Sequence, residues 1–196
     1  MENVYEKLSQ LIVNAFNIAF LAVLGKDLIF CSINNKIDHL FLSNIPWDIA
    51  SLIGELSKVT NKIFGAAKNP NTSETWAIIH LNRLSNDWEV TSNRLILETT
   101  VINISSALED FLNEIVQTNI KAFIINKYPE GAKFLNEFRA TRNCLVHNQG
   151  KADQKYLDEN PQITRVNKIG KQLPLDWNYI YDNTARIINF ARLCML

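Results

Sequence analysis

Two long stretches of the chain repeat apolar residues at the spacing of an α-helix. They recur every three or four positions from Val4 to Leu24, and again from Arg94 to about Ile125. Residues three and four apart share one face of a helix, so this spacing predicts two amphipathic helices. Glycine and proline number only 6 and 5 among 196 residues, whereas a β-sandwich of this size would need more turn residues. The fold class is therefore expected to be all-α.

Weaker periodicity and helix-boundary residues predict the other elements. We expect Gly25 to end the first helix, and we predict further helices at 37–42, 44–65, 71–84, 130–148 and 176–193. Residues 151–174 are polar and contain two prolines and a glycine, so we expect a loop with a short hairpin near 163–173. Because no repeat or long linker divides the sequence, we expect a single domain over residues 1–196.

Charge is balanced over the whole chain but uneven along it. The formal net charge of zero is unusual for a protein that coats nucleic acid non-specifically. Residues 131–171 nevertheless hold eight Lys or Arg against four Asp or Glu. This excess indicates either a local site for a polyanion or the ordinary basic residues of helix C-termini and loops.

Cysteine and histidine usage gives no sign of a metal site. The three cysteines, Cys31, Cys144 and Cys194, are widely spaced and form no CxxC pair, which is typical of a reducing compartment. No cluster of cysteine and histidine has the spacing of a zinc site. We therefore expect no metal and no other cofactor.

The N-terminal sequence favours a cytoplasmic protein with no membrane contact. Glu2 and Glu6 stand where a secretion signal carries positive charge. The most apolar run, Leu11–Leu24, has 14 residues and includes two asparagines, whereas a membrane-spanning helix needs roughly 20 apolar residues. We expect this run to be a buried core helix.

One segment carries residues suited to catalysis, namely Arg142–His147, which we call the signature segment. The sequence contains no phosphate-binding glycine loop, no GxSxG and no HExxH. On a helix, Asn143 and His147 share a face, as do Arg139 and Asn143, while Arg142 lies about 140° from His147. Arginine is long enough to swing towards the histidine, and a second subunit could close the gap. This face is too polar to be an ordinary core stripe.

These residue types suffice for RNA cleavage without a metal. Histidine can transfer protons near neutral pH, since its unperturbed pKa is about 6.5. Arginine matches a phosphate with a fork of donors and can stabilise the extra charge as the ribose 2′-hydroxyl attacks the neighbouring phosphorus. Asparagine can orient the imidazole or bind a phosphate oxygen. The alternative is structural, because a histidine at a helix C-terminus often only satisfies carbonyls or the helix dipole.

The signature segment resembles the RxxxxH motif of the HEPN superfamily (higher eukaryotes and prokaryotes nucleotide-binding domains). The similar stretch reads Arg-Asn-Cys-Leu-Val-His-Asn-Gln-Gly over residues 142–150, with Tyr156 soon after. The upstream residues 105–115 resemble the long family helix that packs beside the motif helix. The resemblance extends over about residues 95–195. It implies a HEPN-like helical bundle with additional N-terminal helices. The additional helices would lie in residues 1–90 and the HEPN-like core in residues 91–196.

The resemblance also implies an activity. Active members of the family are metal-independent endoribonucleases in which two signature segments face each other across a homodimer and form one composite site. Many act as toxins or antiviral defence effectors. By this likeness Arg142 would contact the scissile phosphate, His147 would transfer protons and Asn143 would support both. We further predict that the substrate is an RNA, for example a tRNA, and that it is contacted by Arg139, Asn148, Lys151 and Tyr156.

The resemblance leaves a second hypothesis open. Some family members have no nuclease activity and serve as modules for dimerisation, nucleotide binding or partner-protein binding. The additional N-terminal helices would suit such a module, because they could cover the site or bind an antitoxin or another protein.

Overall fold

The computed structural model of the chain is mostly helical, as the sequence predicts, and forms two compact units. One unit comprises residues 1–22 and 93–196, and the other comprises residues 23–92. The structure describes residues 2–43, 52, 64–68, 71–72, 74–84, 87–117, 119–160 and 163–196.

The first helix, α1, spans Glu2–Asn34 and is longer than the predicted segment from Val4 to Leu24. Gly25 lies inside this helix, and the prediction that it ends the helix is wrong. A Cβ atom at Gly25 would meet nothing within 4 Å, so the position is open and no packing reason interrupts the helix there. The helix is long and apolar enough to cross a membrane by length and composition alone, and 22% of its most apolar window is buried.

The long helix predicted for residues 94–125 is two helices. Helix α3 spans Trp88–Ile115 and α4 spans Ile120–Lys127. Asn119 starts the second one, because its side chain accepts a hydrogen bond from the Ala122 backbone N–H at 3.1 Å. Such a cap satisfies a donor that the first turn of a helix leaves unpaired, and it fixes a change of direction that apolar spacing does not reveal.

Two further predicted helices are confirmed, and one predicted loop contains a helix. Helix α5 spans Ala132–His147 and α7 spans Trp177–Met195. Between them, Gln154–Glu159 forms α6, where only a loop was predicted. The hairpin predicted near 163–173 is limited, among the described residues, to a single β-bridge between Lys151 and Gln172.

The unit of residues 23–92 contains a three-stranded antiparallel sheet where helices were predicted. Its strands are β1 (His39–Ser43), β2 (Phe64–Lys68) and β3 (Thr75–His80), with β3 in the centre, followed by a 3-10 turn at Leu81–Arg83. The helices predicted at 37–42 and 71–84 are therefore wrong, and the helix predicted at 44–65 does not include Phe64 and Gly65. Leu52 has a helical backbone, and the rest of that segment, 44–51 and 53–63, lies outside the described residues.

The strand pairing explains these errors. Ala77 is aligned with Leu42 on one side and with Ala66 on the other. Thr75 and Ala77 are buried and alternate with half-buried residues, which is the period of two expected for a strand. A short apolar segment with isoleucines is ambiguous in sequence, and pairing between distant segments decides its structure.

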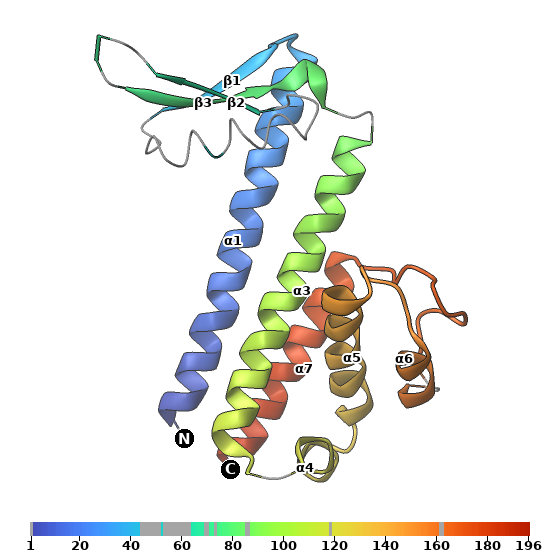
Figure 1. Cartoon of the computed structure of the whole chain (residues 1–196). Coiled ribbons are helices and arrows are strands. Elements are labelled where there is room, and N and C mark those ends of the chain that lie inside the picture. Colours follow the sequence, from blue (N-terminus) through green and yellow to red (C-terminus); the bar gives the residue numbers. More distant parts are fainter. Residues whose placement is uncertain are drawn as a thin grey trace. The chain divides into compact units, whose positions relative to one another are not determined.

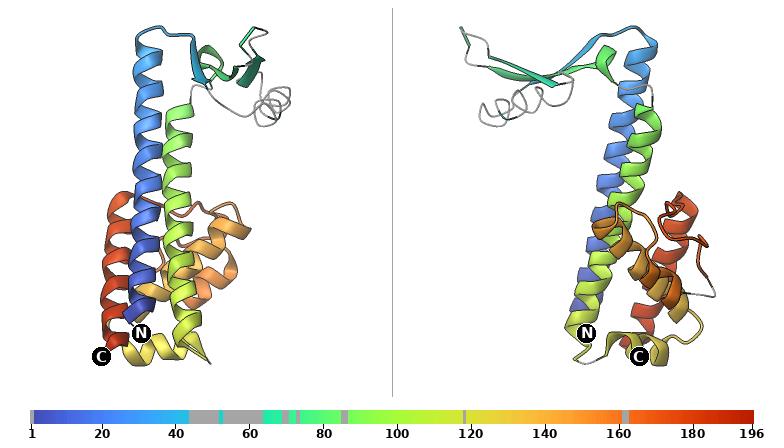
Figure 2. Two further views of the ribbon diagram at one scale, coloured as in Figure 1. Left: turned by 90° about the vertical axis from the view of Figure 1, so that its left-hand side faces the viewer. Right: turned by 45° about the vertical axis from the view of Figure 1, so that its right-hand side comes forward.

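The main core lies within the helical unit and joins five helices. Ile12 of α1, Leu108 of α3, Ile124 of α4, Leu135 of α5 and Phe190 of α7 all belong to it. Helix α4 lies across the end of the bundle at which α7 ends (Figures 1 and 2). Since all five helices contribute fully or almost fully buried apolar side chains, the position of α5 is fixed by burial of apolar surface.

A polar cluster is buried beside this core, around Glu137 of α5. The Glu137 carboxylate, 3% exposed, accepts hydrogen bonds from Thr141 (2.8 Å), the Tyr156 hydroxyl (2.6 Å), Arg165 Nε (3.0 Å) and the Tyr179 hydroxyl (2.9 Å). The donors come from α5, α6, the following loop and α7. A buried carboxylate is costly unless it is paired and hydrogen-bonded, and Glu137 satisfies both conditions.

Arg165 completes this polar cluster. Its guanidinium stacks on the Tyr179 ring at 3.8 Å from the centroid and donates through Nη2 to Thr141 Oγ1 at 2.7 Å. It also donates through Nη1 to the Pro174 carbonyl. One side chain therefore binds the loop after α6 to α5 and α7.

We expect the replacement Arg165→Met to destabilise the protein by about 3–5 kcal/mol, because it leaves the Glu137 charge buried and uncompensated. The double variant Glu137→Leu/Arg165→Met should lose less than the sum of the two single changes. Urea denaturation followed by circular dichroism measures both values. A single-variant loss below about 0.5 kcal/mol, the range of ordinary surface substitutions, would contradict the assigned role.

Candidate functional site

The signature segment forms the last two turns of α5. Asn143 and His147 are exposed on this helix, whereas Arg142 is half-buried. Arg142 donates through Nη1 to Asn143 Oδ1 at 3.2 Å, and its Nε is buried with no hydrogen-bond partner among the described residues. None of the hydrogen bonds found in the described part of the chain joins His147 to Arg142 or Asn143. The single chain therefore presents these groups on one helix end without assembling them into a closed site.

The turn that ends α5 fixes where His147 lies. The Gly150 N–H donates to the Cys144 carbonyl at 2.9 Å, and both Gln149 (φ 55°) and Gly150 (φ 74°) adopt left-handed backbone conformations. A Cβ atom at Gly150 would lie 2.6 Å from Gln172 Nε2 and 3.0 Å from Arg94 Nη2. Glycine is therefore favoured there for both conformation and space.

Arg94 of α3 supports this turn from the side. Its Nη1 donates to the Leu173 carbonyl at 2.6 Å, and its Nε donates to Glu98 Oε1 at 2.6 Å. The loop carrying Leu173 is in turn hydrogen-bonded to the Gly150 carbonyl. Sequence reasoning missed this support, although opposite charges four residues apart on a helix were a usable signal.

Arg139, predicted as a substrate contact, is engaged with another helix. It donates through Nε and Nη2 to the two carboxylate oxygens of Glu109 on α3, at 2.5 and 3.1 Å. This forked geometry is the favoured one for arginine and a carboxylate. Arg139 is about one quarter exposed and still lines the cavity described below.

Asn148 and Lys151 lie in the segment that follows α5. The Asn148 side chain donates to Asp153 Oδ2 at 2.7 Å, and Asp153 also accepts from the Tyr156 backbone N–H as the N-cap of α6. Lys151 is exposed, and its backbone forms the bridge to Gln172. Of these two predicted substrate contacts, Asn148 is therefore engaged by Asp153, whereas the side chain of Lys151 is available to a ligand.

Tyr156, which was also predicted as a substrate contact, is buried in the core. It is 1% exposed, and its hydroxyl donates to Glu137. Burial, and next the nearby Glu137 carboxylate, raise the pKa of Tyr156 from 10.0 to about 12. Burial likewise raises the pKa of Tyr179 well above its ordinary value. Both hydroxyls therefore stay protonated as donors to Glu137 at neutral pH.

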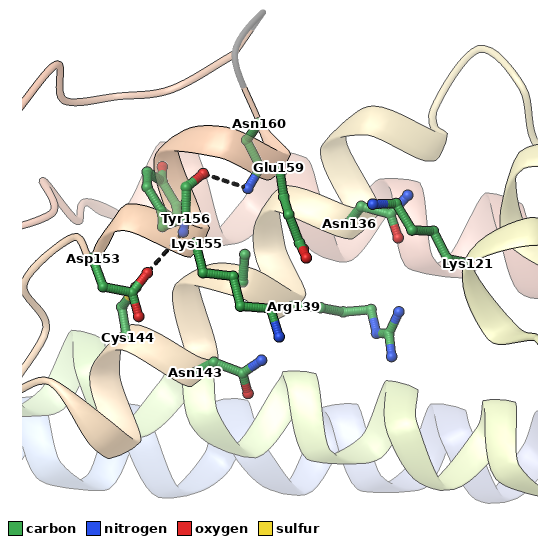
Figure 3. A pocket seen from close by; sticks show the side chains of 11 residues that line it. Lys121, Asn136, Arg139, Asn143, Cys144, Asp153, Lys155, Tyr156, Glu159 and Asn160 are labelled. Carbon is green, nitrogen blue, oxygen red and sulfur yellow. Dashed lines mark hydrogen bonds between the residues drawn. The ribbon is translucent and has the colours of Figure 1, made fainter.

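A polar cavity of about 180 Å³ lies beside the signature segment. Figure 3 shows that its wall combines the α5 face carrying Asn136, Arg139 and Asn143 with side chains of α4 and α6, among them Lys121, Lys155 and Glu159. Asn143 thus belongs both to the signature segment and to the cavity. Sequence reasoning missed Lys121, Asn136, Lys155 and Glu159, because the tertiary fold brings them together and no local spacing marks them.

The described residues contain no group of three or more His, Cys, Asp or Glu placed to hold a metal ion. Cys144 is buried next to the signature, and burial raises the pKa of its thiol. It is therefore held as a neutral thiol and is not poised as a nucleophile.

Comparisons with protein families, curated proteins and solved structures gave no match to this chain. Assignment to the HEPN superfamily is therefore a proposal that depends on the residues of the signature segment and their placement.

We expect the alkaline stability of the protein to depend on Tyr156. Its pKa is higher in the folded state than in the unfolded state, so the stabilisation is complete below pH 10 and is lost as the pH rises through about 12. Tyr156→Phe should show a shallower fall of unfolding free energy over this range in urea titrations. Tyr181→Phe, at a position 71% exposed on α7, is the matched control. Equal slopes for all three proteins would refute the expectation.

Proposed function

We propose that this chain is a metal-independent endoribonuclease of the HEPN type. The observation that carries the proposal is the placement of Arg142, Asn143 and His147 on the accessible C-terminal end of α5, beside a polar cavity that Asn143 also lines. Helix α5 itself is held by the apolar core and by the Glu137 cluster. A rigid helix with polar groups at an accessible end suits a site that must position a phosphodiester.

The chemistry assigned to these residues is transesterification. The ribose O2′ forms a bond to phosphorus, the bond from phosphorus to O5′ breaks, and the products end in a 2′,3′-cyclic phosphate and a 5′-hydroxyl. Proton transfer from O2′ and to O5′ is assigned to His147. Arg142 stabilises the charge that develops on the phosphoryl oxygens, and its hydrogen bond to Asn143 orients it.

The complete site is proposed to form in a homodimer. Within one chain, the described contacts do not bring His147 to Arg142, and the buried Nε of Arg142 has no partner among the described residues. A second signature segment facing the first would supply one histidine as the base and the other as the acid. An RNA strand, from a tRNA loop or another single-stranded region, would lie between them.

We further propose that the protein acts in the cytoplasm as a toxin or defence effector and binds an antitoxin or another protein. Exposed apolar side chains on α1 support a protein partner, since Ile18, Phe20 and Leu21 are 55%, 55% and 69% exposed. The same observation favours the second candidate, a catalytically inactive module that dimerises or binds a nucleotide or a protein.

The test is incubation of the purified full chain with total RNA in EDTA. Wild type should cleave, and His147→Ala or Arg142→Ala should reduce the rate by at least about 100-fold, as expected for losing a proton-transfer or charge-stabilising group. His39→Ala and Arg192→Ala, at exposed positions outside the signature segment, are the matched controls and should cleave like wild type. Circular dichroism confirms that each variant folds.

Cleavage that persists in both signature variants, or that EDTA abolishes, would overturn the proposal. If no protein cleaves RNA, the inactive-module hypothesis replaces it.

A further inference from the structure

A second hollow, of about 390 Å³, adjoins the polar cavity. The two share Lys121 of α4, Asn136 of α5, Glu159 of α6 and the following Asn160, so they form one groove between α4, α5 and α6. The part near Asn143 is polar, whereas the far part is lined by aliphatic side chains that include Ile125, Pro129 and Ile163. The groove therefore offers a polar end next to the signature segment and an apolar end away from it.

Among the charged groove side chains, Lys121, Lys133, Lys155 and Glu159 have no hydrogen bond or ion pair within the described residues, so positive charge outweighs negative charge. Asp153 is engaged by Asn148 and by the α6 backbone, and Arg139 is engaged by Glu109. Lys121 and Lys155 are exposed, and no hydrogen bond or ion pair to either is found within the described residues. Lys121 of α4 and Lys155 of α6 both line the polar part, as does the Glu159 carboxylate, and the two ammonium groups can donate to a phosphate there.

Asn160 gives the groove a fixed hydrogen-bond acceptor. Its side chain, 4% exposed, donates through Nδ2 to the Tyr156 carbonyl at 2.9 Å, as Figure 3 shows. A carbonyl oxygen can only accept, so the amide cannot be reversed, and Oδ1 is the acceptor that the Asn160 side chain can offer to the groove that it lines. The carboxylate of Glu159 is a second acceptor at the junction between the two parts.

We propose that this groove binds one nucleotide of the RNA strand next to the cleaved phosphodiester and selects bases that carry an exocyclic amino group. The phosphate lies between Lys121 and Lys155, and the base enters the apolar part. The identification of the ligand as part of an RNA strand depends on the proposed function, whereas the selectivity for amino-bearing bases depends on the groove alone.

The selectivity follows from donor and acceptor pairing. Adenine, cytosine and guanine each present an amino group whose two N–H donors can serve both Asn160 Oδ1 and Glu159, whereas uracil offers one donor on this edge, the ring N3–H, between two carbonyl oxygens. With uracil, one of the two acceptors is left unpaired and faces a carbonyl oxygen, which is costly in a partly enclosed site. Single-stranded bases are commonly read by such contacts to their edges.

The experiment measures binding of nucleoside monophosphates to the full-length His147→Ala protein by ¹H–¹⁵N NMR titration. AMP, CMP and GMP should shift the side-chain amide signals of Asn136 and Asn160 and bind at least about fivefold more tightly than UMP, the factor expected for one net hydrogen bond. Equal affinity for UMP, or no shift of these amide signals, would overturn the proposal.

Two variants test the two parts of the groove separately. Ile125→Glu places a charge in the apolar part, at a position 47% exposed where the change need not disturb the core, and should weaken AMP binding at least about tenfold. Lys121→Ala removes a phosphate contact and should weaken it about fivefold. The control Lys127→Ala, on the same helix but outside the groove, should bind like the parent protein. Unchanged binding in both groove variants would contradict the assignment.

The outcomes distinguish this inference from the proposed function. If RNA is cleaved in EDTA with dependence on His147 but the groove variants bind AMP normally, the groove assignment fails and the ribonuclease stands. If AMP binding follows the predictions but no RNA is cleaved, the groove stands as a nucleotide site and the ribonuclease proposal fails.

Discussion

The buried carboxylate of Glu137 is the constraint on which the arrangement around α5 depends. It accepts from two tyrosines and an arginine that come from three different segments, and the pKa of Tyr156 rises to about 12 beside it. An ionised carboxylate can stay in the interior only while all its donors remain in place. Together with the burial of Leu173, these hydrogen bonds fix the loop after α6 against α5 and α7.

Because the core and this cluster both hold α5, its C-terminal end can carry polar groups without a structural role. Gly150 turns the chain away immediately after His147, and Arg94 supports that turn from α3. The same packing of α4 and α6 against α5 creates the groove that continues from Asn143. The candidate catalytic groups and the groove therefore depend on one rigid element, which suits chemistry that requires accurate positioning of a phosphodiester.

The sequence predicted those elements whose structure depends on residues close together in the chain. Apolar spacing located α5 and α7, and the spacing of Arg142 and His147 placed the signature at the end of α5. The sheet was missed because pairing between segments about 40 residues apart, such as His39 with His80, overrides weak helical spacing. The partner of Glu137, Arg165, lies 28 residues away in a polar loop. Neither this pair nor the groove has a local pattern that could have predicted it.

The most direct measurement is a crystal structure of the wild-type protein with a short RNA that is fully 2′-O-methylated and so lacks the nucleophile. We expect a phosphate within hydrogen-bond distance of Arg142 and Asn143, His147 facing O2′ or O5′, and a neighbouring base in the groove between α4, α5 and α6. RNA bound elsewhere, with the signature segment facing solvent in every copy, would contradict this expectation.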